Sequence, residues 1–404
     1  AFHHGRLDAV DALRRAVQRY PDDPDAWFLL GDTYWHLGGQ ALIGIEEAVA
    51  ALERAIALDP SFAPYYIHPI EYAINEGDTA RARHGLDTYA RLAGGSTWER
   101  RMRLAYALVL GDSTARSHAV EALDTVPSDV LAGGSLYQLR TLHAFAALAA
   151  ERRTRPDADA RTLWRLAQAL VGQGKIASAL DLLRNDPMVN DAFRAVQLYA
   201  LHLSGAAVPE ALLDEWLRLP AADSTEIDVI LAAGAAAAER GRWGEHARAV
   251  QAARAVAERS RVAGDTAAAQ AASAIVRALE GYARWQRGDA AAALEILETA
   301  QREAVGLGPL FEANKMLRRW LAELHERLGS PRDALRYYES LVYPASPYAT
   351  LRAAIVHEAL GEADKARERY ASALAAWQDA DPDYAPARQA RAALERLGPD
   401  RPQP

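Results

Sequence analysis

Apolar residues recur three or four positions apart in residues 25–60, with polar residues on the remaining faces. This spacing predicts two amphipathic α-helices that pack on each other through their apolar faces. The apolar positions are Trp27, Leu30 and Tyr34 in the first helix and Ala48, Leu52 and Ala55 in the second. Gly31 lets the two helices approach closely, and Pro60 ends the second one. A glycine-rich connection longer than an ordinary turn, residues 36–45, joins them.

The neighbouring segments repeat parts of this unit. The second half of the pattern also occurs upstream, at Ala9, Leu13, Ala16 and Pro21. An array that begins with an unpartnered helix leaves an apolar face bare, so we expect that residues upstream of Ala1 are missing. Downstream, Pro69 occupies an apolar position of the next unit, which predicts that its first helix is bent or starts late.

The order of these positions resembles the tetratricopeptide repeat, whose pattern is W-x2-L-G-x2-Y followed by A-x3-F-x2-A and a closing proline. The resemblance implies an all-α, tetratricopeptide-type α-solenoid, in which antiparallel helix pairs stack into a right-handed superhelix. The sequence has no period-two runs bounded by hairpin turns, which also favours the all-α class. Residues 360–398 resemble the last repeat and closing helix of repeat regions attached to bacterial serine/threonine kinases and winged-helix transcriptional activators.

The repeat pattern is clear near both ends of the chain and weak in the middle. We therefore expect N-terminal units in residues 1–95, the first of them truncated, and degenerate helical repeats in residues 96–305. Further units and a closing helix are expected in residues 306–404. There Ser330, Pro331 and Asp333 have the order of an N-cap, a first-turn proline and a capping-box carboxylate.

Charge and composition exclude several classes of protein. The net charge of -8 and the lack of a long basic run argue against binding of nucleic acid through its phosphates. The longest apolar stretch, residues 229–238, is far shorter than the roughly 20 residues of a membrane-spanning helix, so we expect a soluble chain. Only three of the 46 basic residues are lysines, which is typical of a GC-rich bacterial genome. The compartment, cytoplasmic or extracytoplasmic, stays open.

A search for catalytic and metal-binding motifs gives none. The chain has no cysteine, so disulfides, thiolate metal sites and a cysteine nucleophile are excluded. The motifs of protein kinases are absent, and Gly174 and Lys175 lack the flanking residues of a phosphate-binding loop. Neither His357 nor the pair at residues 3–4 has a further histidine at the spacing of a helical zinc site. We therefore predict no enzyme activity, no cofactor and no metal.

Aspartates gather at residues 22–25 and again at residues 379–383, directly before predicted helices. Aspartate side chains accept hydrogen bonds from the first N–H groups of a helix and favour the positive end of its dipole. We expect each group to cap the helix that follows it in the sequence.

The resemblance also implies a binding surface, because the first helix of each tetratricopeptide pair lines the concave face that holds ligands. The corresponding residues of this chain are Asp25, Phe28, Asp32 and Trp35 in the first complete unit, and Ile67, Glu71 and Ile74, with His68 beside them, in the next. Phe28 and Trp35 are the strongest candidates, since interfaces favour large aromatic anchors. Alternatively, the long connection or the neighbouring helix covers both rings and makes them part of the core.

The sequence therefore predicts a non-catalytic scaffold or sensor module that binds a protein or peptide, as part of a bacterial signalling or regulatory protein. A groove that is apolar with acidic positions favours a basic or aromatic peptide. The alternative is self-association, because a stacked array with an exposed terminal helix, residues 7–20, can pair head to tail into oligomers or filaments.

Overall fold

The computed structural model describes residues 8–122, 160–217, 226–305, 311–342 and 346–398, together with the single positions 142, 143, 146 and 150. In these residues the regular elements are α-helices and two short 3-10 helices, without a strand. The predicted all-α class is therefore confirmed. None of the helices described is long and apolar enough to span a membrane.

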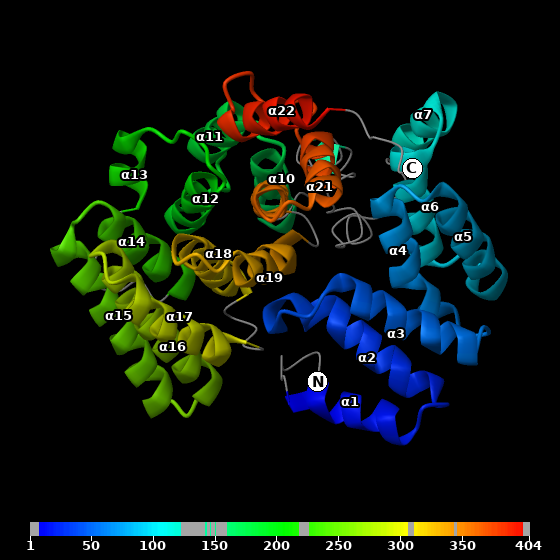
Figure 1. Cartoon of the computed structure of the whole chain (residues 1–404), viewed down its shortest axis with the longest axis horizontal. Helices are drawn as coiled ribbons and strands as arrows, with labels where there is room; N and C mark the ends of the chain where they lie inside the picture. Colours follow the sequence, from blue (N-terminus) through cyan, green and yellow to red (C-terminus); the bar gives the residue numbers. More distant parts are fainter. Residues whose placement is uncertain are drawn as a thin grey trace.

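The N-terminal helices form successive hairpins along one side of the molecule, drawn from blue to cyan in Figure 1. They are α1 (Asp8–Arg19), α2 (Pro24–Leu37), α3 (Ile45–Leu58), α4 (Ile67–Glu76), α5 (Thr79–Ala93), α6 (Thr97–Leu110) and α7 (Ser113–Ala122), with the 3-10 helices η2 (Gly38–Ala41) and η3 (Ala63–Tyr66).

The remaining helices continue the array around the molecule and back to its middle. The middle set is α10 (Ala160–Gly172), α11 (Ile176–Asn185), α12 (Asp191–Leu203), α13 (Glu210–Trp216), α14 (Ile227–Glu239), α15 (Trp243–Val262), α16 (Thr266–Gln286) and α17 (Ala290–Ala304). The C-terminal set is α18 (Phe311–Arg327), α19 (Pro331–Val342), α20 (Pro347–Ala359), α21 (Ala363–Ala376) and α22 (Ala385–Leu397). Figure 1 places α14–α17 opposite α4–α7, with α18, α19 and α21 between them.

The hairpin of α2 and α3 forms for the reasons that the sequence predicts. Asp23 caps α2, because its Oδ1 accepts hydrogen bonds from the N–H groups of Asp25 at 3.0 Å and Ala26 at 3.2 Å. Gly31 faces α3, and a Cβ added to it would lie 2.6 Å from Cγ of Leu52. A side chain at this position would push the two helices apart, so the predicted role of Gly31 is confirmed.

The next unit starts late, which is one of the two predicted outcomes for Pro69. The chain first forms η3, and α4 begins only at Ile67. Pro69 then lies in the first turn of α4, where a missing N–H interrupts no hydrogen bond within the helix. The helix is short as a result and ends at Gly77, whose φ of 80° is the left-handed conformation common at helix ends.

The buried apolar side chains form two clusters. The smaller one joins α1, α2 and the beginning of α3, from Val10 to Ala48. The larger one extends from Ala55 in α3 to Ala393 in α22. One core therefore connects the helices on both sides of the molecule with the C-terminal helices between them. The division into residues 1–95, 96–305 and 306–404 stays a prediction.

The array closes on itself through the long connection between α2 and α3. In its η2 turn, the carbonyl of Gln40 accepts a hydrogen bond from Nε2 of Gln301 in α17 at 2.7 Å. The carbonyl of Gly39 accepts one from Nη1 of Arg318 in α18 at 2.8 Å. A Cβ at Gly39 would lie 2.7 Å from the carbonyl oxygen of Ser340, so glycine permits this approach. The inserted residues thus tie the first complete unit to the C-terminal ones.

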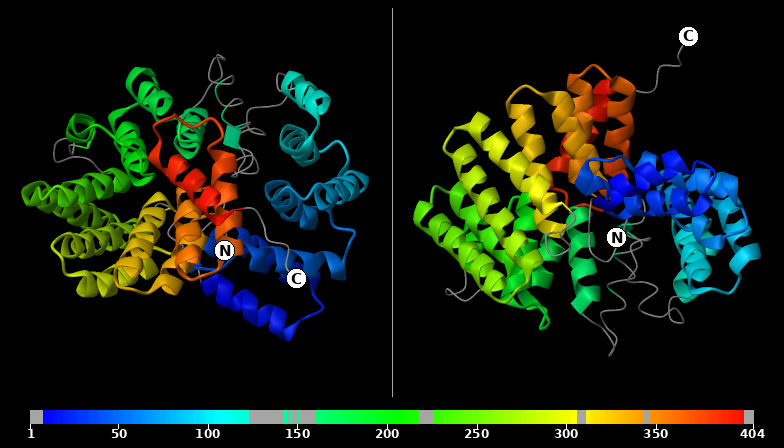
Figure 2. Two further views of the ribbon diagram at one scale, coloured as in Figure 1. Left: turned by 45° about the horizontal axis from the view of Figure 1, so that its top comes forward. Right: turned by 90° about the horizontal axis from the view of Figure 1, so that it is seen from below.

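A second joint connects the C-terminal helices to α10–α12, and the left view of Figure 2 shows the orange and red helices next to the green ones. The last carbonyls of an α-helix have no partner within the helix. Here Nε1 of Trp377 donates to the Gly172 carbonyl at 2.9 Å, and the hydroxyl of Tyr384 donates to the Ser204 carbonyl at 2.7 Å. Arg319 donates to the carbonyl of Leu203. Side chains of the C-terminal helices therefore satisfy the carbonyl ends of α10 and α12.

The prediction for the aspartates at residues 379–383 needs a correction, because Asp381 caps a distant helix. Its Oδ2 accepts a hydrogen bond from the N–H of Ala177, in the first turn of α11, at 2.8 Å. Its own N–H donates to the carbonyl of Gly174 at 3.0 Å. The helix that follows in the sequence, α22, begins after Tyr384 without a side-chain cap. The prediction for Asp23 at the start of α2 is confirmed, as described above.

A half-buried carboxylate connects three helices of the middle set. Glu239, at the end of α14, accepts hydrogen bonds from the hydroxyls of Tyr199 at 3.0 Å and Tyr282 at 2.6 Å. Its second oxygen lies 2.9 Å from Nε2 of His202. Burial alone would raise the pKa of Glu239, but the hydrogen bonds from these three side chains outweigh it and hold the pKa below the ordinary value.

We expect that Asp381→Ala destabilises α11 although the two lie far apart in the sequence. Loss of an N-cap costs about 1 kcal/mol, and here it also weakens the joint to the C-terminal helices. Hydrogen exchange measured by mass spectrometry should quicken at the start of α11. Asp383→Ala, at an exposed neighbouring position, is the matched control. Equal exchange in the two variants would show that the contact does not stabilise α11.

We also expect that Glu239→Gln lowers stability at pH 7 by about 2 kcal/mol, the range for hydrogen bonds to a charged group. The pKa of Glu239 is lower in the folded chain than its ordinary 4.5. Its contribution is therefore present above pH 4.5 and is lost as the pH falls through the lower, folded-state pKa. The difference between the urea midpoints of wild type and variant should therefore become smaller as the pH is lowered from 7 to below 4.5. Glu295→Gln, at an exposed position, is the control, and its urea midpoint should stay close to that of wild type over the same pH range.

Candidate functional site

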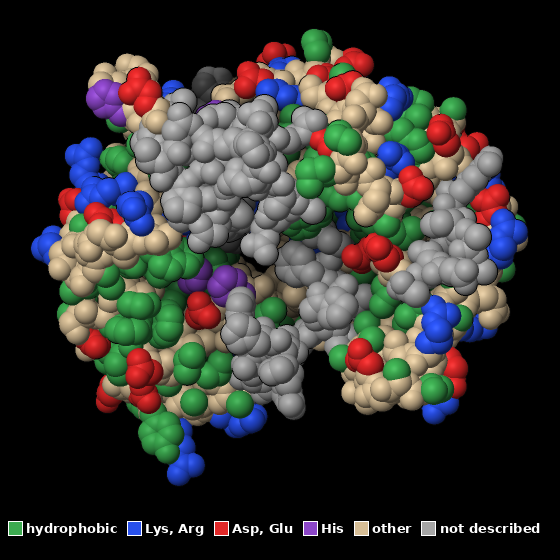
Figure 3. Space-filling view, turned by 180° about the vertical axis from the view of Figure 1, so that it is seen from behind, with side chains coloured by type: hydrophobic (Ala, Val, Ile, Leu, Met, Phe, Trp, Pro, Cys, Tyr) green, Lys and Arg blue, Asp and Glu red, His purple; other side chains and the backbone are tan. Residues whose placement is uncertain are grey.

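The predicted binding residues lie on two helices, α2 and α4, which form one face of the molecule together with η3. Asp25, Phe28, Asp32 and Trp35 follow one another along α2, and Ile67, His68, Glu71 and Ile74 lie on α4. Figure 3 shows histidine and acidic side chains next to a hollow in the middle of the face that it presents. We call this surface the α2–α4 face, and it has an aromatic part and a polar part.

The aromatic part contains three rings. Phe28 lies 5.0 Å from the ring of Tyr65 and 6.2 Å from that of Phe62, and Tyr65 and Phe62 are 4.8 Å apart. Edge-on and tilted geometries of this kind stabilise aromatic clusters. Phe28 is half-buried, whereas 44% of Phe62 is exposed. The hydroxyl of Tyr65 donates to Oδ1 of Asp25 at 2.6 Å, so a carboxylate borders the rings.

The polar part is built around His68. Its Nδ1 lies 2.8 Å from Oε2 of Glu71, and its Nε2 lies 3.2 Å from Oδ1 of Asp32. The ring of Trp35 stacks on the ring of His68 at 4.5 Å with an interplanar angle of 20°. Nε2 of His36 lies 3.7 Å from the same Asp32 oxygen. Residues of two successive units thus meet around one imidazole.

The charges of these groups depend on one another. Burial opposes a charge on His68, but the hydrogen bonds and charges of Asp32 and Glu71 outweigh it and raise the pKa of His68 to about 9. Burial likewise opposes ionisation of Asp32, but the hydrogen bond to His68 and the charges of both histidines hold its pKa below the ordinary value. Burial lowers the pKa of His36. At neutral pH His68 is therefore a cation between two carboxylates.

The predicted residues differ in how far they are accessible. Ile74 is 1% exposed and belongs to the core, and Glu71 and His68 are also buried. Ile67 is half-buried, and so are the Phe28 and Trp35 rings, which the neighbouring η3 and α4 cover in part. The alternative that neighbouring residues cover these rings therefore holds in part. Binding through this face stays a prediction.

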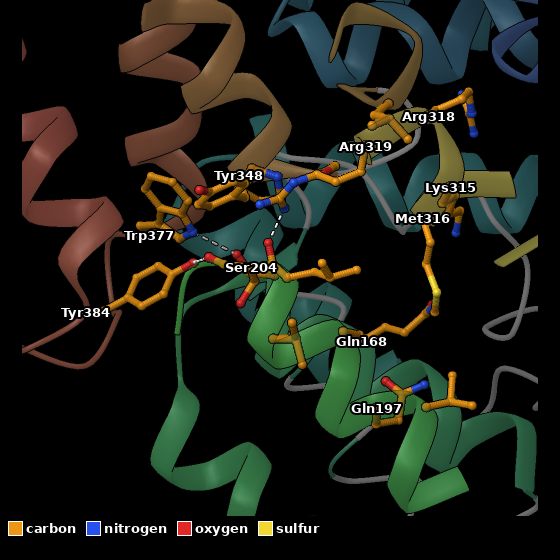
Figure 4. Close-up of a pocket in the computed structure, with 18 residues that line it drawn as sticks. Gln168, Gln197, Ser204, Lys315, Met316, Arg318, Arg319, Tyr348, Trp377 and Tyr384 are labelled. Atoms are coloured by element: carbon orange, nitrogen blue, oxygen red, sulfur yellow. Dashed lines mark hydrogen bonds between the residues drawn. The ribbon is translucent and has the colours of Figure 1, made fainter. Parts of the chain in front are cut away.

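A second candidate is a cavity of about 180 Å³ at the joint between α10–α12 and the C-terminal helices, drawn in Figure 4. Its positive side chains are Lys315, Arg318 and Arg319 of α18. Arg319 stacks on Tyr348 at 4.0 Å and pairs with Glu323 at 2.6 Å. The guanidinium groups of Arg318 and Arg319 are thus committed to the two joints described above.

The same cavity contains two amides that are incompletely bonded. Gln168 of α10 and Gln197 of α12 line it, and the Oε1 atom of each is buried without a hydrogen-bond partner. Their oxygens could accept hydrogen bonds from a small polar group. The cavity is small, however, since ligand sites usually enclose about 300–1,000 Å³. We regard it as unfilled space at a joint.

The sequence missed three residues of the α2–α4 face, namely His36, Phe62 and Tyr65. For His36 a signal existed, because it follows Asp32 by four positions and such residues share one face of a helix. Phe62 and Tyr65 precede α4 in a segment whose 3-10 conformation the repeat pattern does not predict. Their rings reach the face because α4 starts late.

Comparison with known proteins supports the repeat and reveals no near relative. Residues 4–41 and 278–350 match the family model "Tetratricopeptide repeat". These segments contain α1, α2 and η2 at one end, and the end of α16 to the beginning of α20 at the other. No curated protein matches the sequence.

Several solved structures are similar to the chain at low identity. The yeast Tom70 structure has 13% identity and a TM-score of 0.30, with 96% of this chain and 91% of that chain covered. The TPR domain of P58(IPK) has 14% identity and a TM-score of 0.27, with 96% and 92% covered. The Cut9–Hcn1 complex of the APC/C has 12% identity and a TM-score of 0.28, with 96% and 82% covered. Two segments of this all-α chain are therefore similar to tetratricopeptide repeats, and the family model covers less than half of the chain.

Proposed function

We propose that the chain is a non-catalytic scaffold that binds a protein partner through an extended segment with basic and aromatic side chains, on the α2–α4 face. The observation that carries this proposal is the aromatic part of that face. Phe62 is 44% exposed and rests on Phe28 and Tyr65, which hold it in place. Rigid aromatic side chains of this kind are frequent binding anchors, because they offer a large contact area and lose little entropy.

The acidic side chains of the face set the charge of the partner. Asp25 borders the aromatic rings and is exposed, and Asp32 lies further along α2. Glu71 is buried next to His68, so the carboxylates that a partner can reach are those of Asp25 and Asp32. A partner with Arg or Lys complements this surface, and an Arg side chain can also stack on the exposed Phe62 ring.

The wider setting is part of the same proposal. The resemblance of residues 360–398 to repeat regions of bacterial kinases and winged-helix regulators supports a sensor role in a bacterial signalling protein. Head-to-tail self-assembly through α1 receives less support. The outward positions of α1 are polar and exposed at Asp11, Arg14 and Arg15, while Val10 and Val17 pack inward against α2. We therefore favour binding of a different protein.

The test is selection from a library of random peptides displayed on phage, followed by calorimetry with the selected peptides and the full chain. We expect selected sequences to combine Arg or Lys with an aromatic residue. Phe62→Ala should weaken binding by at least 1 kcal/mol, the usual loss at an anchor residue. Salt should also weaken it, because the attraction is partly electrostatic.

Leu29→Ala is the matched control, since Leu29 is 51% exposed on α2 and is not one of the residues of the α2–α4 face. Circular dichroism and thermal unfolding should show that both variants keep the helical fold. Selection of acidic peptides, or equal affinity of both variants and wild type for the selected peptides, would contradict the proposal.

A further inference from the structure

The polar part of the α2–α4 face presents three metal-ligating side chains to one another. They are Asp32 and His36, one helical turn apart on α2, and His68 on α4. One ligand atom from each lies within 4.8 Å of the other two. Two of these separations are shorter, at 3.2 Å from Asp32 to His68 and 3.7 Å from Asp32 to His36.

These distances are close to those around a tetrahedral ion. Zinc binds imidazole nitrogen and carboxylate oxygen at about 2.0–2.2 Å, which places neighbouring ligand atoms about 3.4 Å apart. The Asp32 contacts already lie near this value. The two histidine nitrogens lie at most 4.8 Å apart, so this pair has to close by at most about 1.4 Å to match the tetrahedral value. His36 can make this adjustment, because its side chain is 36% exposed at the end of α2.

His68 has the hydrogen-bond partner that a metal-binding histidine usually has. A ligating histidine almost always donates its second ring N–H to a carboxylate or carbonyl, which fixes the ring and raises its basicity. Here Nδ1 of His68 faces the buried carboxylate of Glu71 at 2.8 Å, which leaves Nε2 directed toward Asp32. Trp35 stacks on the ring and restricts its rotation.

We propose that Asp32, His36 and His68 bind one zinc ion, with Glu71 as the carboxylate that orients His68 and the fourth coordination position open. Two histidines and one carboxylate are a ligand set that zinc takes when a position is left for water or another molecule. The ion would join α2 to α4, and hence one repeat to the next.

Charge supports the same assignment. The site holds two carboxylates, Asp32 and Glu71, at short distances from one ring. The guanidinium of Arg101 in α6 also acts on Glu71. A divalent ion at Nε2 would supply a positive charge that both carboxylates attract, while Nδ1 stays directed at Glu71.

The test is calorimetric titration of the full chain with zinc chloride in the absence of any peptide. Because residues 3–4 are a histidine pair that can bind metal by itself, the titration uses a His3→Ala, His4→Ala background. We expect one zinc ion per chain. Cobalt(II) in place of zinc should give the visible absorption of a four-coordinate ion, which reports on the ligands directly.

Two variants and a control decide the assignment. Glu71→Gln should weaken zinc binding about 10–100-fold, as is usual for residues that orient a ligand, and His36→Ala should weaken it further. His36 is partly exposed, so its loss is compatible with folding. His84→Ala, an exposed histidine of α5, should bind zinc like the background protein.

Absence of binding in the background protein would overturn the proposal, and so would equal affinity of His36→Ala and His84→Ala. These outcomes are independent of the proposed peptide binding. A chain that binds zinc but no peptide would support the zinc site and contradict peptide binding on this face. A chain that binds peptide but no zinc would contradict the zinc site and support peptide binding.

Discussion

Helix ends need hydrogen-bond partners, and this need shapes the whole molecule. The carbonyl ends of α10 and α12 receive their donors from Trp377, Arg319 and Tyr384, which lie 116 to 205 residues later in the sequence. The first N–H groups of α11 receive their acceptor from Asp381. A group that leaves water without a partner is costly, so these contacts fix where the C-terminal helices lie. The position of the C-terminal helices against α10–α12 follows from them.

Most repeat arrays are stabilised by contacts between neighbouring units, so their stability is close to a sum of local terms. This chain adds contacts between units that are far apart in sequence. Arg318 connects η2, in the first complete unit, with the end of α19. Glu239 draws α12, α14 and α16 together. The units are therefore expected to unfold more cooperatively than those of an open array.

The sequence predicted the helical class and the α2–α3 hairpin, because Gly31 and the spacing of apolar residues determine contacts within one unit. The contacts between distant units could not be predicted. An aspartate such as Asp381 can cap the helix that follows it or a distant one, and the sequence does not show which. The α2–α4 face was predicted in outline through Phe28 and Trp35. Its polar part depends on His36 and His68, which meet only because α4 begins late and turns its first residues toward α2.

The η2 connection has a mechanical consequence. An open solenoid behaves like a spring, because its ends can separate through small rotations at every repeat interface. Here η2 is fastened to α17 and α18 through Gln301 and Arg318. Tension applied between the two ends must break this fastening before the repeats can share the extension. The molecule is therefore stiff under small loads, and it yields abruptly once the fastening opens.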